Sequence, residues 1–156
     1  MGTRCGNLDP GVILHLMETK NLSVKDMTKM LYKESGLLGV SGISQDMRTL
    51  LASDQPEAEE AIDLYCYRLI REIGSLAAAI GGLDALVFTG GIGEHSAEVR
   101  RRVCSRLGWL GATLDESANN ADQLHISGAD SKVDLLVIPT NEEWMIAHHA
   151  QTLLDL

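Results

Sequence analysis

The sequence DALVFTGGIGEHSAEVR (Asp84–Arg100) places a short apolar run directly before a cluster of glycines. The run Leu83–Thr89 contains β-branched and aromatic residues and predicts a buried strand. The segment Gly90–His95 predicts a tight glycine loop, and Ser96 is a typical N-cap for a following helix. A strand, a turn and a helix in this order are typical of α/β proteins, which bind ligands at the carboxyl ends of their strands.

A second buried strand is predicted downstream, at Asp134–Ile138. The loop Pro139–Glu143 follows it, and Trp144–Leu154 predicts a closing amphipathic helix. Gly111–Leu114 is a weaker strand candidate. Continuous apolar strands belong in a sheet covered on both faces, and two of them make a poor sheet. We therefore expect the chain to be part of a larger α/β domain whose other strands lie upstream.

Helices dominate the remaining prediction. The helix after Ser96 carries Arg100, Arg101, Arg102 and Arg106 on one side, with Val103 and Leu107 on its buried side. Residues Gly36–Gly42 predict a glycine-rich break. Further helices are predicted from caps and apolar spacing: one from Pro10 with Asp9 as N-cap, one from Ser23 with Asp26 completing a capping box, a short one after Ser44–Arg48, and a long one over Glu57–Ile80, ended by Gly81 and Gly82.

Composition excludes several classes of protein. The chain has 156 residues, of which 45% are hydrophobic, so it can bury a core and is not a disordered polymer. A net charge of −9 argues against a protein held to nucleic acid by phosphate contacts. No apolar run is long enough to cross a membrane, and the first residues lack a signal-peptide profile. The cysteines Cys5, Cys66 and Cys104 match no metal-binding or disulfide pattern, which favours reduced thiols in the cytoplasm.

The glycine cluster by itself allows two interpretations. Glycines before a helix suit a nucleotide, because backbone can approach the ligand closely and helix N–H groups favour anions. No Gly-Lys-Ser/Thr follows, which excludes a Walker A loop. The pattern Gly91-x-Gly93-x-x-Ser96 is similar to a dinucleotide fingerprint without its third glycine, and Asp115 or Glu116 would serve as its ribose-binding acid. A plain strand-to-helix turn fits equally well.

Three other groups are ambiguous from the residues alone. Glu142 and Glu143 would hold Mg²⁺ or would simply favour a helix N-terminus. Arg4, in a loop, suits a developing phosphoryl charge or is a surface arginine. Asp46–Arg48 has no assignable role on its own. The histidines show no metal-ligand spacing.

Taken together, four motifs resemble those of acetate kinases, in the same order. They are MGTRCGNLDPG (Met1–Gly11), KESGLLGVSGISQDMR (Lys33–Arg48), DALVFTGGIGEHSAEVR (Asp84–Arg100) and VIPTNEEWMIA (Val137–Ala147). That family belongs to the acetate and sugar kinase/Hsp70/actin superfamily. The resemblance implies an α/β fold, namely a partial ribonuclease-H-like (actin-like ATPase) domain that is helix-rich with a short buried parallel sheet.

The resemblance also implies roles for individual residues. Arg4 matches the arginine that stabilises the transition state of phosphoryl transfer, and Glu142 matches the acid at the magnesium site. The nucleotide-binding positions are Asp46, Met47 and Arg48 at the adenosine and Gly91, Ile92, Gly93, Glu94 and His95 in the ATP-binding glycine loop. Two positions depart from the family pattern: Asn7 replaces the usual Asp, which removes a negative charge, and His95 replaces the frequent Asn.

The implied activity is the reversible, ATP-dependent phosphorylation of acetate to acetyl phosphate, with ADP as product and Mg²⁺ as metal. A cytoplasmic homodimer is implied, with acetate and ATP as its partners and no nucleic acid or membrane. The family's enzymes are more than twice as long, so residues 1–156 are expected to form a single C-terminal domain portion without the N-terminal domain, inactive in isolation. The alternatives are a propionate or butyrate kinase, a non-catalytic nucleotide-binding or dimerisation module, and a dinucleotide-binding domain of an oxidoreductase.

Overall fold

The structure is a computed structural model that describes residues 2–154; Met1, Asp155 and Leu156 lie outside the described residues. The chain divides into two compact units, the first ending at Leu69 and the second comprising Ile70–Leu156. Helix α5 (Pro56–Ile80) runs across this division. Its range confirms the long helix predicted over Glu57–Ile80.

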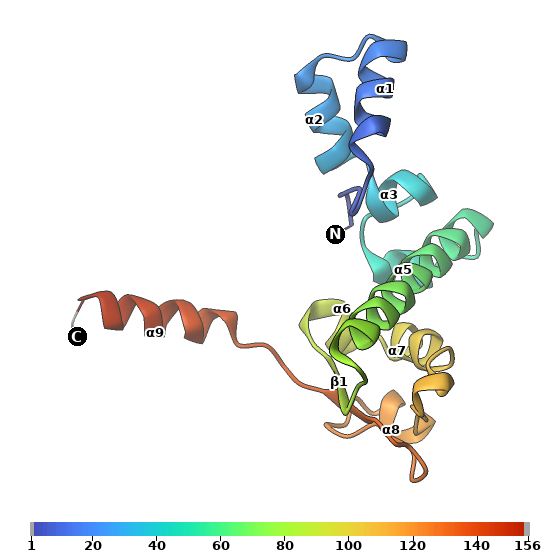
Figure 1. Ribbon diagram of the computed structural model, residues 1–156, viewed down its shortest axis with the longest axis vertical. Coiled ribbons are helices and arrows are strands. Elements are labelled where there is room, and N and C mark those ends of the chain that lie inside the picture. Colours follow the sequence, from blue (N-terminus) through green and yellow to red (C-terminus); the bar gives the residue numbers. More distant parts are fainter. Residues whose placement is uncertain (1, 155–156) are drawn as a thin grey trace. The chain divides into compact units, whose positions relative to one another are not determined.

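The first unit opens with two helices that lie side by side (Figure 1). In α1 (Pro10–Lys20), the Asp9 carboxylate accepts a hydrogen bond of 2.6 Å from the Gly11 N–H. In α2 (Val24–Lys33), Ser23 and Asp26 form the reciprocal capping box. These contacts satisfy N–H groups that a helix N-terminus leaves unpaired, and both predicted helices are confirmed.

The glycine-rich break predicted at Gly36–Gly42 is wrong. Residues Gly36–Ser41 form helix α3, which ends at Gly42 with φ +65°. The helix buries Leu37 and Ser41, and the Ser41 hydroxyl donates to the Leu37 carbonyl at 2.7 Å. Burial of this turn outweighs the poor helix propensity of its glycines. Helix α4 (Met47–Leu51) follows as predicted.

An aliphatic core supports each unit. The first unit buries Met27, Leu37, Met47, Leu50, Ala58, Ala61, Ile62 and Cys66. The second unit buries Ala77, Phe88, Val99, Val103, Cys104, Leu107, Ala112, Ala118, Ile126, Val133, Leu135 and Val137. Cys66 therefore belongs to the core, and burial raises the pKa of the Cys104 thiol to about 12, which makes it unreactive.

The second unit contains a parallel two-stranded sheet, as the sequence predicts. Strand β1 (Ala85–Phe88) pairs with β2 (Asp134–Val137), with Ala85 opposite Asp134. Strand β2 buries two of its residues, but β1 buries only Phe88. The expectation that β1 is buried throughout is wrong, because the described sheet has no further strand beside it and leaves the Val87 side chain 45% exposed. Gly111–Leu114 forms no strand there, only an isolated bridge from Leu114 to Ser127.

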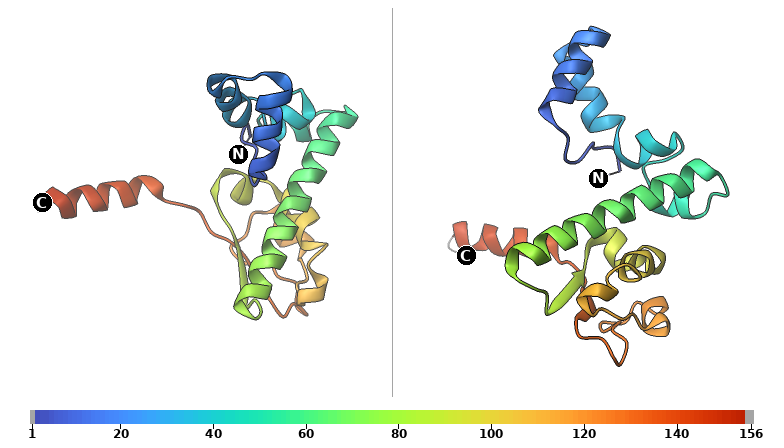
Figure 2. Two further views of the ribbon diagram at one scale, coloured as in Figure 1. Left: turned by 45° about the horizontal axis from the view of Figure 1, so that its top comes forward. Right: turned by 45° about the vertical axis from the view of Figure 1, so that its right-hand side comes forward.

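Short helices connect the two strands. They are α6 (Gly90–His95), α7 (Ala97–Cys104), the 3₁₀ turn η1 (Gly108–Leu110) and α8 (Glu116–Asn120). In both views of Figure 2, α6 runs directly into α7. Ser96 caps α7 by accepting from the Val99 N–H, and Val103 and Leu107 are buried, as predicted.

Helix α9 (Glu142–Leu154) follows β2 and begins two residues before the predicted start. None of its residues is buried, so the apolar face predicted for it is not covered within residues 2–154. Across those same residues, no helix is both long and apolar enough to cross a membrane.

Candidate functional site

The turn after β1 is a short helix and not the tight loop that its glycines predict. Gly90, the first residue of α6, has φ +70°, a conformation that favours glycine. Gly93 approaches the end of β1 so closely that a β-carbon would lie 3.2 Å from the carbonyl carbon of Phe88. Gly90 is therefore favoured by its backbone conformation, and a side chain at position 93 would require the backbone at Phe88 to shift by a few tenths of an ångström. We call residues Gly90–His95 the glycine turn.

Gly91 differs from Gly90 and Gly93, because it is exposed and has neither a positive φ nor a close backbone contact. No atom lies within 4 Å of the place where its β-carbon would be, and its φ is not positive. Backbone geometry therefore does not require glycine here. An exposed glycine at the carboxyl end of a strand is suited to close approach by a ligand.

Glu94 ties the glycine turn to the loop after β2. Its Oε1 accepts hydrogen bonds from the Gly90 N–H at 2.7 Å, the Thr140 N–H at 2.9 Å and the Thr140 hydroxyl at 3.0 Å. The Thr140 N–H is the main cause that holds the pKa of Glu94 below its usual range, assisted by the Thr140 hydroxyl, Gly90 and the nearby His95. Glu94 therefore remains ionised, and it occupies an N–H group that an anionic ligand would otherwise use.

The loop after β2 leads directly to the predicted metal ligand. Asn141 accepts a hydrogen bond of 3.0 Å from the Trp144 N–H, and Glu142 is exposed at the first position of α9. Within residues 2–154, no group of three or more His, Cys, Asp and Glu side chains is arranged to hold a metal ion. Mg²⁺ bound to a nucleotide commonly takes one or two carboxylates together with phosphates and waters. A single exposed carboxylate therefore fits Mg²⁺ that arrives with a phosphate ligand.

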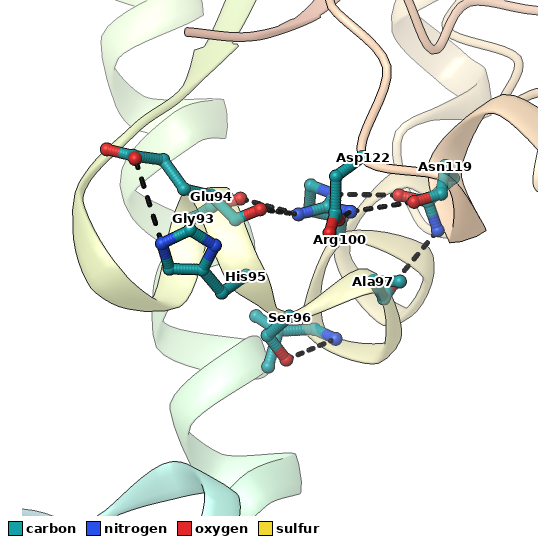
Figure 3. Close-up of polar contacts among 9 residues, drawn as sticks. Gly93, Glu94, His95, Ser96, Ala97, Arg100, Asn119 and Asp122 are labelled. Atoms are coloured by element: carbon teal, nitrogen blue, oxygen red, sulfur yellow. Dashed lines mark hydrogen bonds and ion pairs between the residues drawn. The ribbon is translucent and has the colours of Figure 1, made fainter. Parts of the chain in front are cut away.

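Arg100 lies beside the glycine turn and binds two of its carbonyls (Figure 3). The sequence places it among the arginines opposite the buried side of α7, but its side chain is completely buried. Its Nη1 donates to the carbonyls of Gly93 and Glu94, both at 2.8 Å. Its Nε and Nη2 donate to the side-chain and backbone oxygens of Asn119 at 2.7 and 2.8 Å, and Nη2 also pairs with Asp122.

This arrangement uses all five N–H donors of the Arg100 guanidinium. Two of the acceptors are carbonyls at the end of α6, where a helix has no internal donor to offer them. Asn119 is also fully buried and donates from Nδ2 to the Ala97 carbonyl at 2.9 Å. The glycine turn is therefore fixed to α7 and α8 by a buried network without an unsatisfied side-chain atom.

In the first unit, Arg4 lies in an exposed loop beside α2. Its guanidinium carbon lies 5.5 Å from the centre of the Tyr32 ring. The backbone on both sides is held, because the Thr3 carbonyl accepts from the Ser35 N–H at 3.0 Å and the Cys5 N–H donates to the Leu31 carbonyl at 3.1 Å. A cation–π contact does not consume N–H donors, so Arg4 retains the groups that bind phosphoryl oxygens.

The other predicted nucleotide contacts of the first unit lie at the start of α4. Asp46 is the N-cap of this helix and also receives two hydrogen bonds from the Arg48 guanidinium, at 2.6 and 3.1 Å. Met47 is buried as a whole residue, with 4% of its surface exposed. A β-carbon on Gly2 would collide with the Gln45 carbonyl, which places the Arg4 loop against the segment leading to Asp46.

Replacing Arg48 by methionine is expected to raise the pKa of Asp46 from about 2 toward its ordinary value of 3.8 without reaching it. The side-chain hydrogen bonds from Arg48 are the largest cause of the low pKa, and the Arg48 N–H, which the variant keeps, is the second. Because the folded pKa is depressed, this pairing stabilises the fold above the ordinary value and is lost as pH falls toward 2. NMR titration of the Asp46 carboxyl carbon measures the shift, and an unchanged midpoint would contradict the pairing.

Sequence reasoning missed Thr140, Asn119 and the buried role of Arg100. Arg100, Val103 and Leu107 are spaced i, i+3, i+7, which places them on one helical face, so this spacing indicates that Arg100 is buried. Thr140 carries no such signal, because its partner Glu94 is 46 residues away. Asp115, considered above as a ribose-binding acid, caps α8 through the Ala118 N–H at 3.0 Å.

The chain matches the profile of the Acetokinase family over residues 1–148. It is 62% identical to an acetate kinase of Rhodopseudomonas palustris and 54% identical to one of Methylocella silvestris, each over 99% of this chain. It covers 39% and 38% of those two proteins, so it spans about two fifths of the length of these relatives.

Solved structures give the same result. The crystal structure of Porphyromonas gingivalis acetate kinase is 41% identical, with a TM-score of 0.90 over 99% of this chain and 40% of that one. A propionate kinase from Francisella tularensis is 39% identical, with a TM-score of 0.87 over 94% of this chain and 38% of that one.

The chain thus has a helix-rich α/β fold of the actin-like ATPase type, as the sequence predicts. It belongs to the acetokinase family. Membership of this family argues against the alternative that the glycine pattern had left open, a dinucleotide-binding domain of an oxidoreductase.

Proposed function

We propose that the protein is an acetate kinase, which transfers the γ-phosphoryl group of ATP to acetate and forms acetyl phosphate and ADP reversibly. The observation that carries the proposal is the exposed Gly91 at the carboxyl end of β1, in a turn that Glu94 joins to the loop bearing Glu142. A nucleotide site and a metal ligand on adjoining loops are what phosphoryl transfer requires. Membership of the acetokinase family and the names of the relatives support the same reaction.

In this proposal each predicted residue has one task. Arg4 donates to the equatorial oxygens of the transferring phosphoryl group and neutralises their charge. Asp46, Met47 and Arg48 are proposed to contact the adenosine. Gly91, Ile92, Gly93, Glu94 and His95 are proposed as the ATP-binding positions of the glycine turn. Glu142 holds Mg²⁺, which when bound to the nucleotide offsets negative charge on its phosphates.

The wider expectations belong to the same proposal. Acetate and ATP are the proposed substrates, and a cytoplasmic homodimer is the proposed form of the enzyme. Residues 1–156 are proposed to act as one C-terminal domain portion of it. Because the relatives are about two and a half times as long, we expect the isolated 156 residues to show no turnover.

A propionate kinase is the second candidate, since one solved relative carries that name at 39% identity. Acetyl phosphate and propionyl phosphate formation, measured side by side with the protein as its gene encodes it, separates the two. A larger kcat/KM for acetate supports the proposal. A larger value for propionate overturns it in favour of the second candidate.

Replacing Gly91 by alanine is expected to weaken ATP binding about tenfold while leaving the fold intact. The new methyl group enters open space in the free protein but occupies the surface that the nucleotide approaches. Alanine also favours a helix over glycine, so α6 does not lose stability. Calorimetric titration with Mg-ATP measures the change.

Gly108→Ala is the matched control, because Gly108 also has open space around its β-carbon position and no positive φ. It should bind Mg-ATP like the natural protein. Equal ATP affinities for Gly91→Ala and Gly108→Ala would show that no nucleotide approaches the glycine turn, and the proposed site would then be wrong.

A further inference from the structure

Glu94 occupies an unusual place for a residue assigned to a nucleotide-binding turn. The side chain is 12% exposed, and its Oε1 already accepts three hydrogen bonds, one from Gly90 and two from Thr140. A carboxylate oxygen has no donor to offer and little remaining capacity as an acceptor. Its negative charge also repels phosphate. The Oε1 atom of Glu94 is therefore poorly suited to touch the phosphates of ATP.

The same residue is held at its backbone. The Glu94 carbonyl accepts from Nη1 of the buried Arg100 at 2.8 Å, as Figure 3 shows. The Glu94 backbone is thus bound to the buried network of Arg100, and its side chain is hydrogen-bonded to the loop after β2. Thr140 lies two residues before Glu142, the proposed metal ligand, and is itself exposed.

We infer that Glu94 is a positioning residue that couples the glycine turn to the loop that leads into Glu142, so that the nucleotide and Mg²⁺ are bound at fixed positions relative to each other. The inference rests on the proposed function. It assigns Glu94 a task different from the nucleotide contact that the family resemblance implies. Removing the carboxylate would release residues 139–141 and leave Glu142 without a fixed place relative to the turn. Binding of Mg²⁺ with ATP would then suffer more than binding of ATP alone.

Hydrogen exchange tests the contact directly and needs no ligand. In Glu94→Ala, the amides of Gly90 and Thr140 should exchange about ten- to a hundredfold faster than in the natural protein, because each loses a charged acceptor. Glu94→Gln keeps an acceptor oxygen, so its exchange rates at Gly90 and Thr140 should lie between those of Glu94→Ala and the natural protein. Thr140→Val, which removes only an exposed hydroxyl donor, should give a smaller increase and leaves the fold intact. Unchanged exchange in Glu94→Ala would overturn the inference.

Magnesium titration tests the coupling. In the protein as its gene encodes it, saturated with ATP, Glu94→Ala should weaken apparent Mg²⁺ binding about tenfold, with a much smaller loss of metal-free ATP affinity. Glu94→Gln should restore most of the Mg²⁺ affinity. Glu98→Ala is the matched control, since it removes a carboxylate from the neighbouring helix α7 that pairs with Arg101 and Arg102 instead of Thr140.

The two proposals fail in different ways. If the natural protein binds no Mg-ATP, the proposed function is wrong and the coupling falls with it. If the natural protein binds Mg-ATP and Glu94→Ala shows the same Mg²⁺ dependence, the proposed function stands and the coupling is wrong. Equal losses of Mg²⁺ binding and metal-free ATP binding would also overturn it, because a general loosening of the turn would then explain both.

Discussion

Replacement of Arg100 by methionine is expected to lower the free energy of unfolding by about 3–5 kcal/mol. Methionine fills part of the space but offers no donor to the carbonyls of Gly93 and Glu94 or to the buried side-chain oxygen of Asn119. Buried acceptors that lose their donor carry the full cost of desolvation. The free energy of unfolding of Arg100→Lys should lie between those of Arg100→Met and the natural protein, because an ammonium cannot match the five donors of the guanidinium.

Urea unfolding followed by circular dichroism measures this loss, and Arg101→Met serves as its control. Arg101 is the next residue of α7, its side chain is 46% exposed, and it pairs with Glu98 at 2.6 Å. An exposed pair one turn apart contributes at most about 0.5 kcal/mol. A loss of similar size in the two variants would contradict the assignment of Arg100 to a buried network.

Arg100 also illustrates where sequence reasoning succeeds and fails in this chain. The buried side of α7 was predicted from Val103 and Leu107, and both are buried. Arg100 lies on that same face, but the sequence groups it with the arginines of the opposite side, because its acceptors cannot be identified from sequence. Asn119 and Asp122 lie 19 and 22 residues further along, and the two carbonyls belong to a turn predicted as a loop. Partners that only tertiary structure supplies decide whether such a side chain is buried.

Helices predicted from local cap contacts were correct more often than elements whose conformation depends on packing. The caps at Asp9 and at Ser23 with Asp26 placed two helices correctly, because each cap contact spans only two or three residues. The glycines of Gly36–Gly42 and Gly90–His95 misled the prediction, since both segments are helical turns. Glycine lowers helix propensity by roughly 1 kcal/mol, and packing of a single buried side chain such as Leu37 can outweigh that.

At the candidate site, too, local motifs were informative and contacts between distant segments were not predictable. Motif resemblance assigned Gly91, Glu142 and Arg4 without any structure, and the geometry of the turn is consistent with a ligand at Gly91. The link from Glu94 to Thr140 could not be derived, because it depends on parallel pairing of two strands far apart in the chain. Motif resemblance therefore predicts which residues carry the proposed chemistry, and the fold shows what holds the glycine turn in place.

Arg4→Lys is expected to lower kcat for acetyl phosphate formation about a thousandfold, with little change in the KM for ATP. The guanidinium presents a planar fork of donors to the equatorial oxygens, whereas an ammonium is a compact point charge. An interaction that forms only in the transition state lowers kcat and kcat/KM equally when it is lost. Lysine also retains a cation over the Tyr32 ring, so the loop that carries position 4 keeps its contact with α2.

Steady-state kinetics with the protein as its gene encodes it, over a range of ATP and acetate concentrations, distinguishes this role from simple binding. Arg106→Lys is the matched control, because it makes the same substitution at an exposed arginine of the second unit. A kcat for Arg4→Lys within about threefold of that of Arg106→Lys would exclude Arg4 from the transition state. A rise in the KM for ATP at unchanged kcat would assign Arg4 to ground-state binding of the nucleotide, since uniform binding changes KM alone. Only a fall in kcat at constant KM supports the role proposed for Arg4.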